Sequence, residues 1–264
     1  MPTAVDPERS TTDVSLVKVA AVGSVAGLLS GLLGVGGGIV LVPGLVSIAK
    51  LDRRLAHGTS LAATLPIALA SFVTYLAHGH VDWAVAGWLA LGAISGAVVG
   101  TKLLSVLPRR TITIVFIAVV VATAVRLVFA ATGEGRPTLS GAGAVALVVV
   151  GFVTGVIAGL LGVGGGVVMV PAMVVGFGMV PVVAKGTSVT VIIPTSIMGT
   201  WRNRTRNNVD LRLAATAGVI GATTAVVGAI IADQMSPELS NVLFGVLLVV
   251  VAVTQFASLR RMDG

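Results

Sequence analysis

The sequence predicts an all-α, polytopic membrane protein made of two inverted-topology repeats, each with about five membrane-entering helical segments. The composition is the first reason: 56% of the 264 residues are hydrophobic and 10% are charged, whereas soluble domains are about 25% charged. The second is that apolar stretches near the ~20 residues needed to cross a bilayer follow one another from Val14 to Leu259. The third is an internal duplication whose two copies distribute their basic residues differently.

The duplication is gapless. A shift of 128 residues superimposes GLLGVGGGIVLVP (Gly31–Pro43) on GLLGVGGGVVMVP (Gly159–Pro171), and GTS at Gly58–Ser60 on GTS at Gly186–Ser188. A register kept through separate motifs indicates two homologous halves. The predicted organisation is a polar cytoplasmic N-terminus (1–13), repeat 1 (14–131), a linker (132–138), repeat 2 (139–260) and a C-terminal tail (261–264).

Each repeat divides into five apolar segments in the same order. In repeat 1 they are Val14–Leu33, Ile39–Ala49, Gly58–Ala77, Trp83–Leu104 and Thr111–Ala131. In repeat 2 they are Ser140–Leu161, Val167–Gly178, Gly186–Trp201, Leu211–Ala232 and Leu239–Leu259. The second segment of each repeat is short, and its length at 1.5 Å per residue reaches roughly half of the hydrocarbon thickness. It forms a hairpin with the segment before it, re-entrant or spanning, which gives eight to ten segments in total.

Charge sets the expected orientation. The positive connections are Lys50/Arg53/Arg54 and Lys102/Arg109/Arg110 in repeat 1, and Arg202/Arg204/Arg206/Arg212 and Arg260/Arg261 in repeat 2. The connection near Asp233 and Glu238 is negative. The positive-inside rule puts equivalent connections of the two repeats on opposite sides, which requires inverted repeats and places both termini in the cytoplasm. Because the basic residues fall between apolar spans, the net charge of +7 indicates orientation and not nucleic-acid binding.

The duplicated glycine run is the main candidate for a binding site. It comprises Gly34, Gly36, Gly37 and Gly38 in repeat 1, and Gly162, Gly164, Gly165 and Gly166 in repeat 2. Irregular backbone at membrane depth is tolerated where it is packed in protein or lines a wet cavity. Glycines can turn successive N–H groups toward an anion, and the helix that follows adds the positive end of its dipole. The alternative is close helix packing through small residues, which is our interpretation of Gly23/Gly27/Gly31 and Gly92/Gly96/Gly100.

HGTS and KGTS form the second paired motif, with Thr59 and Ser60 in one repeat and Thr187 and Ser188 in the other. They are expected to open a long helix, where their hydroxyls either cap the helix or donate to an oxyanion. His57 and Lys185 occupy equivalent positions, and both can be cationic beside an anion. His57 can also titrate near neutral pH, which makes it a candidate for proton coupling, although a solvated loop histidine is the alternative.

Enzymatic chemistry finds no support in the sequence. Cysteine is absent, which excludes disulfides and thiolate metal sites. There is no H-E-x-x-H, G-x-S-x-G or Walker motif and no pair of buried carboxylates, so we predict no enzyme, no cofactor and no metal. Asp82 and Asp210 precede apolar segments, where an acidic residue favours a helix N-terminus.

The run GLLSGLLGVGGGIVLVP, followed by GTS and then repeated as a whole, resembles the sulfite exporter TauE/SafE family, also called the toluene sulfonate uptake permease family. The resemblance implies a bacterial inner-membrane transporter of small sulfur-containing anions such as sulfite, sulfonates or sulfoacetate. The family motifs match Gly34, Gly36–Gly38 and Pro43, then Gly162, Gly164–Gly166 and Pro171, together with Thr59/Ser60 and Thr187/Ser188. The absence of cysteine departs from some relatives and argues against holding substrate through a thiol.

The sequence thus predicts a secondary transporter that binds an anion between the duplicated loops and works by alternating access. The expected partners are the anion and the lipid bilayer, with protons as a candidate coupling ion and a homo-oligomer left open. The alternatives are a non-transporting scaffold or accessory subunit, and a transporter of a non-sulfur organic anion.

Overall fold

The computed structural model describes residues 15–103, 114, 117–118, 121, 141–162 and 164–260. The N-terminal segment 1–13, the linker, the C-terminal tail and almost all of the predicted segment Thr111–Ala131 lie outside the described residues. Within the described part of the chain, the regular structure is helical and no strand is present.

Ten helical elements are described. They are α1 (Leu16–Leu33), α2 (Gly38–Ser47), α3 (Arg53–Ala77), α4 (Trp83–Leu103), α6 (Gly141–Leu161), α7 (Gly166–Pro171), the π-helical turn η1 (Ala172–Gly176), α8 (Pro181–Arg204), α9 (Leu211–Asp233) and α10 (Pro237–Arg260). Among the described residues, seven helices are long and apolar enough to cross a membrane, and α2 and α7 with η1 are shorter apolar helices. The prediction of an all-α, polytopic membrane protein is confirmed.

The fourth helix of each repeat packs against the first helix of the other repeat. Helix α1 packs along α9, and the equivalent α6 packs along α4. Glycines make the approach possible: a Cβ on Gly27 would lie 1.9 Å from the carbonyl oxygen of Gly221, and one on Gly155 would lie 2.1 Å from that of Ala93. These two contacts are related by the 128-residue shift. The predicted packing role of the glycine stripes is confirmed, since a Cβ would lie within 2.3 Å of neighbouring backbone at each of Gly23, Gly27, Gly31, Gly92, Gly96 and Gly100.

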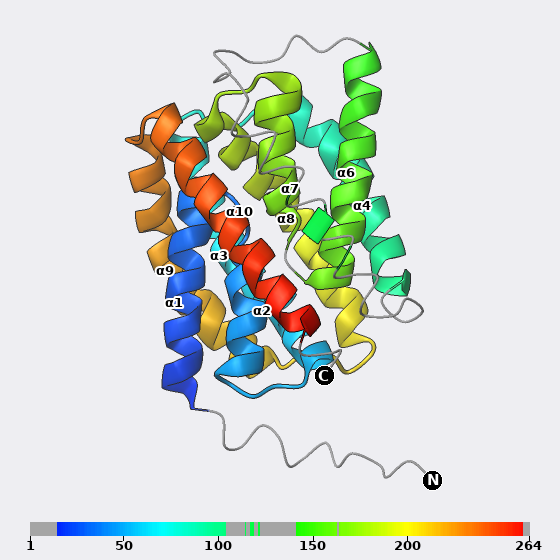
Figure 1. The fold of residues 1–264 in the computed structure, drawn as a ribbon, viewed down its shortest axis with the longest axis vertical. Helices are drawn as coiled ribbons and strands as arrows, with labels where there is room; N and C mark the ends of the chain where they lie inside the picture. Colours follow the sequence, from blue (N-terminus) through cyan, green and yellow to red (C-terminus); the bar gives the residue numbers. More distant parts are fainter. Residues whose placement is uncertain are drawn as a thin grey trace.

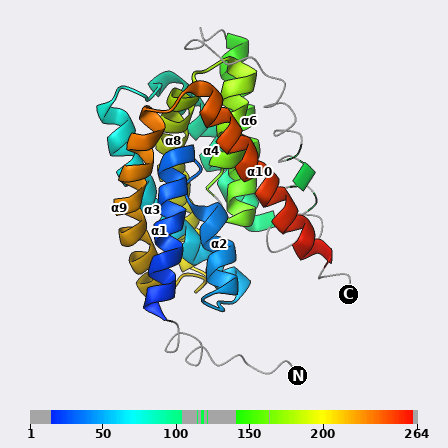
Figure 2. The ribbon, with the colours of Figure 1, turned by 60° about the vertical axis from the view of Figure 1, so that its left-hand side comes forward.

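Two helical bundles result from this exchange. The first contains α1, α2, α3 and α9 around a core that includes Val19, Leu41 and Ile67. The second contains α4, α6, α7, η1 and α8 around a core that includes Leu89 and Met173. Helices α3 and α8 pack against each other between the bundles. Helix α10 lies obliquely across them (Figures 1 and 2) and contacts α8 and α1.

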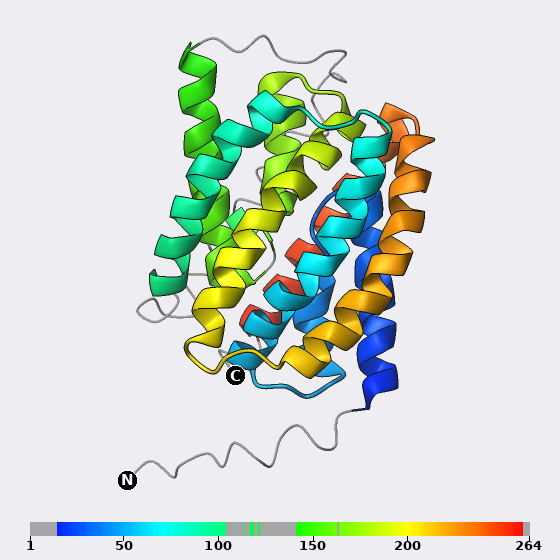
Figure 3. The ribbon, with the colours of Figure 1, turned by 180° about the vertical axis from the view of Figure 1, so that it is seen from behind.

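The connections gather at two ends of the molecule. Helix α1 begins at the lower end of Figure 1, whereas α6 begins at the upper end. The α2–α3 and α8–α9 connections, which carry Lys50 and Arg206, share the lower end, and the α3–α4 and α9–α10 connections share the upper end (Figure 3). By the positive-inside rule we expect the lower end to face the cytoplasm.

Two expectations about segment boundaries are wrong. Helices α3 and α8 begin at Arg53 and Pro181, five residues before Gly58 and Gly186, where the sequence predicts their starts. Asp52 caps α3 by accepting from the amide of Arg54, and Pro181 occupies the first turn of α8, a position that proline favours. The short segment predicted at Val167–Gly178 corresponds to the apolar helix Gly166–Gly176, in which α7 changes to a π-helical turn directly after Pro171.

Candidate functional site

The two glycine loops have the same backbone conformation. Gly34 ends α1 with φ 70° and Gly37 precedes α2 with φ 71°. Gly162 and Gly165 do the same around α6 and α7 with φ 68° and 82°. Positive φ is strained for residues with a Cβ, so the sequence uses glycine at these turns. Gly36 and Gly164 have φ 80° and 82°, and Gly38 and Gly166 are the first residues of α2 and α7.

The two loops touch at the centre of the molecule. A Cβ on Gly166 would lie 2.4 Å from the carbonyl oxygen of Gly34, and one on either Gly36 or Gly164 would meet the side chains of Ile192 and Thr64. Val35, Gly36 and Gly37 are buried. No backbone hydrogen bond between described residues reaches the amides of these three residues. The first loop therefore places backbone donors that no described backbone group binds in a buried, close-packed region.

The two serines of the GTS motifs hold the loop of the opposite repeat. The Ser188 hydroxyl donates to the carbonyl oxygen of Gly34 at 3.0 Å, and the Ser60 hydroxyl donates to that of Gly162 at 3.2 Å. The threonines bind a different partner: Thr187 Oγ1 accepts from the amide of Asp82 at 3.0 Å. Thr59 Oγ1 accepts from the amide of Asp210, also at 3.0 Å. The four hydroxyls therefore join the two repeats.

The expectation that these residues cap a helix is wrong, because α3 and α8 have already begun before them. The caps of the neighbouring helices lie elsewhere. Asp210 accepts from the amides of Arg212 and Leu213 at the start of α9, and Asp82 accepts from the amide of Val85 in α4. The prediction that these two acidic residues favour helix N-termini is confirmed.

His57 and Lys185 lie at matching positions against the two loops. A Cβ on Gly34 would be 2.7 Å from Lys185 Cα, and one on Gly162 would be 2.9 Å from the His57 carbonyl oxygen. His57 is part of α3 and not a loop residue, and its Nδ1 lies 2.6 Å from the carbonyl oxygen of Leu161. Because a carbonyl can only accept, Nδ1 carries the hydrogen in this contact.

Lys185 differs from His57 in that no residue described by the structure binds its charged group. Its side chain is 1% exposed, and its Nζ atom forms no hydrogen bond with any described residue. Removing an ammonium group from water without a counter-charge costs several kcal/mol. A small anion held between Lys185 and the amides of the first glycine loop would offset this cost.

Thr64 is a part of this region that the sequence did not reveal. It lies on α3 beside Gly36, and its hydroxyl is buried with no hydrogen-bond partner among the described residues. The 128-residue shift pairs it with Ile192. That pairing of a polar with an apolar residue between the glycine loops is the signal that could have identified it.

Comparison with known proteins gives the class and then the family. The family model described as sulfite exporter TauE/SafE matches residues 3–127 and 147–263. The chain is a multi-pass membrane transporter and belongs to the sulfite exporter TauE/SafE family.

Relatives support the same class. The chain is 27% identical over 250 residues to a probable membrane transporter protein of Xylella fastidiosa, covering 90% of this chain and 94% of that one. It is 27% identical over 210 residues to the probable membrane transporter protein YunE of Bacillus subtilis, covering 70% and 77%. A probable membrane transporter protein of Haemophilus influenzae is 24% identical over 253 residues, covering 89% and 96%. No solved structure matches the chain.

Proposed function

We propose that the protein is a secondary transporter of small sulfur-containing anions of the sulfite, sulfonate or sulfoacetate type. The anion binds where the two glycine loops meet, and alternating access exposes it to each side of the membrane in turn. The family description supports sulfur as the substrate class. The geometry of the glycine loops supports an anionic substrate, and it does not distinguish one kind of acid group from another.

The observation that carries the proposal is the buried ammonium of Lys185. Lys185 lies in α8 with its Cα and Cβ directly against Gly34 at the start of the first glycine loop, and none of the described residues binds its buried Nζ atom. A packing role alone would not favour lysine here, because a methionine of similar length would fill the space without the cost of a buried charge. A bound oxyanion supplies both a counter-charge and hydrogen-bond acceptors.

The paired contacts support alternating access. Ser188 holds the first loop and Ser60 holds the second, so each loop is fixed by a helix of the other bundle. A movement of one bundle relative to the other would break one of these two hydrogen bonds and leave the other in place. Equivalent repeats that exchange conformations in this way produce two states open to opposite sides.

The experiment is flux into proteoliposomes that contain the purified protein. Wild-type protein should take up ³⁵S-labelled sulfite or a labelled sulfonate with saturation, and unlabelled anion should compete. Lys185→Met should abolish this flux. Lys18→Met, which changes an exposed lysine of α1, is the matched control and should transport normally.

The outcomes separate the alternatives. Competition by carboxylates but not by sulfonates would indicate a non-sulfur organic anion. Wild-type protein that moves none of these anions in either direction under any imposed gradient would contradict the transporter proposal and favour a scaffold or accessory role.

A further inference from the structure

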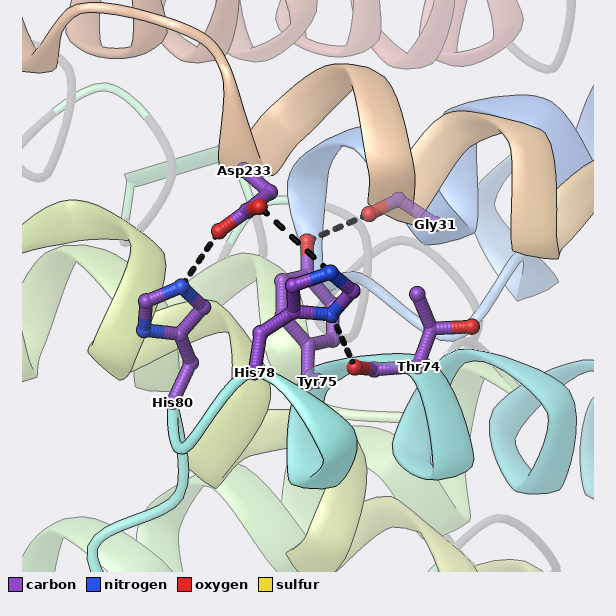
Figure 4. Close-up of polar contacts among 6 residues, drawn as sticks. All are labelled: Gly31, Thr74, Tyr75, His78, His80 and Asp233. Carbon is purple, nitrogen blue, oxygen red and sulfur yellow. Dashed lines mark hydrogen bonds and ion pairs between the residues drawn. The ribbon is translucent and has the colours of Figure 1, made fainter.

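A group of ionisable residues at the upper end of the bundle takes no part in the anion site described above. His78 and His80 follow α3, and Asp233 is the last residue of α9 in the other repeat. Figure 4 shows the Asp233 carboxylate between the two imidazoles. His80 Nε2 lies 2.5 Å from Asp233 Oδ1, and His78 Nε2 lies 3.7 Å from Asp233 Oδ2.

The hydrogen bonds of His78 determine where a proton can add. Its Nδ1 lies 2.8 Å from the carbonyl oxygen of Thr74, and a carbonyl only accepts, so Nδ1 carries a hydrogen in every protonation state. In neutral His78 the Nε2 lone pair therefore faces a carboxylate, which is repulsive. Protonation of Nε2 converts this contact into an ion pair with Asp233.

The position of Asp233 at the end of a helix also favours a cation beside its carboxylate. Asp233 ends α9, where the negative end of the helix dipole disfavours a carboxylate. The two imidazole rings are stacked, with centroids 6.3 Å apart, so two positive charges would repel one another. A positive charge on both rings at once is therefore unfavourable beside the single carboxylate of Asp233.

Other titratable groups near this cluster are few. Tyr75 of α3 lies beside it in Figure 4, with its hydroxyl donating to the carbonyl oxygen of Gly31 in α1. Asp82 lies two residues beyond His80, Glu238 begins α10, and α8 contributes Lys185. Within the described part of the chain, Asp233 is ion-paired only with His78 and His80.

The cluster is joined to the anion site through backbone. A Cβ on Gly186, the neighbour of Lys185, would lie 2.1 Å from the His80 carbonyl oxygen. Thr187, the next residue, accepts from the amide of Asp82. The α3–α4 connection therefore contacts both Asp233 of α9 and the KGTS motif of α8.

The opposite end of the molecule has no equivalent. The 128-residue shift pairs His78 with Arg206 and His80 with Asn208. Arg206 has a fixed charge and donates from Nη1 to the carbonyl oxygen of Thr101 at 3.1 Å. The two ends of a duplicated protein thus differ in one respect: only the upper one, within the described residues, carries a histidine–carboxylate cluster.

We propose that His78, His80 and Asp233 form the binding site of the coupling proton, loaded from the side of the membrane that faces away from the cytoplasm. This inference rests on the proposed anion transport. The proton would compensate the charge of the anion during transport, and the ion pair formed on loading would hold the α3–α4 connection on α9. Because a carboxylate faces its imidazoles, this cluster takes the place of His57, whose Nδ1 contacts the carbonyl oxygen of Leu161 at the end of α6, as the candidate for proton coupling.

The proton site can be tested without substrate. The chain has three histidines, so histidine-selective ¹⁵N labelling of the detergent-solubilised protein gives three sets of signals, assigned with single His→Gln variants. We expect the neutral His78 ring to keep the Nδ1–H tautomer, and Asp233→Asn to change the His78 Nε2 signal because that atom loses the carboxylate it faces. Glu238→Gln, which changes an exposed carboxylate of α10, is the matched control and should leave it unchanged. A His78 Nε2 signal that does not change in Asp233→Asn would overturn the site.

Coupling is tested in proteoliposomes with a sulfonate, whose charge does not change over this pH range, so that any pH dependence belongs to the protein. Asp233→Asn and His78→Gln should lower pH-gradient-driven accumulation by at least about tenfold while anion–anion exchange persists. Unchanged gradient-driven accumulation would refute coupling at this site. Wild-type protein with no exchange at all would refute the transport function instead, and the histidine spectra would then decide the proton site alone.

Discussion

The hydroxyl of Ser188 donates a 3.0 Å hydrogen bond to the carbonyl oxygen of Gly34, 154 residues earlier in the chain. The same relation occurs once more between Ser60 and Gly162. Each of these bonds connects the first turns of a long helix in one repeat with the glycine loop of the other. The arrangement of the site is therefore a property of the two repeats together, and neither could form it alone.

The reciprocal serines give the first prediction. Ser60→Ala and Ser188→Ala should each lower the free energy of unfolding by about 0.5–1 kcal/mol, the usual contribution of one interhelical hydrogen bond in a membrane protein. The measurement is denaturant unfolding in mixed micelles. Ser95→Ala removes a hydroxyl that bonds only within α4, and serves as the control. Losses no larger than for Ser95→Ala would contradict the assigned contacts.

Replacing Lys185 separates function from stability. Lys185→Met should remove anion binding and transport, and it should leave the thermal stability of the ligand-free protein unchanged or higher, because a buried charge without a described partner is removed. Thermal unfolding in detergent with and without sulfite measures both effects. Ligand-dependent stabilisation that survives the substitution would show that Lys185 does not contact the anion.

The binding role of the glycine loops can be tested with a control glycine that also has positive φ but lies outside the loops. Gly37→Ala and Gly165→Ala place a Cβ at φ 71° and 82°, and Gly178→Ala does so at φ 63° with nothing within 4 Å. All three should cost stability, roughly 1 kcal/mol or more from backbone strain. Only the two loop variants should also weaken anion affinity, measured by isothermal titration on the folded fraction. Equal affinity in all three would favour a packing role for the loops.

Topology is open to a direct chemical test because the chain has no cysteine. Gly79 and Asn207 occupy equivalent connections and share positive φ values of 73° and 54°. In intact cells a membrane-impermeant maleimide should label Gly79→Cys, whereas Asn207→Cys should react only after permeabilisation. Labelling of both from the outside would refute the inverted topology.

Much of the fold could be predicted from hydropathy and the repeat. Trp83–Leu103 and Leu211–Asp233 lie within one residue of their predicted bounds, because each begins at an aspartate and crosses without interruption. The starts of α3 and α8 could not be read from hydropathy, since their first turns, RRLAH and PVVAK, contain charged residues. The exchange of α4 and α9 between bundles was also hidden, because glycine stripes predict close packing without specifying the partner helix.

The site was only partly accessible from sequence. The glycine runs and Lys185 are visible as duplicated motifs, but the contact between Ser188 and Gly34 depends on how the repeats interlock. The cluster at Asp233 was missed because His80 lies 153 residues from it. The comparison of His78 with Arg206 under the repeat shift was the available signal.

The central claim is that one anion binds between the glycine loops beside Lys185. Selenite, the heavier analogue of sulfite, allows this to be measured by anomalous X-ray scattering from crystals of the wild-type protein and of Lys185→Met. We predict one selenium peak between Gly36 and Gly164, within hydrogen-bond distance of Lys185 Nζ, that disappears in the variant. A peak elsewhere in the protein, or one that persists between the loops in Lys185→Met, would contradict the account.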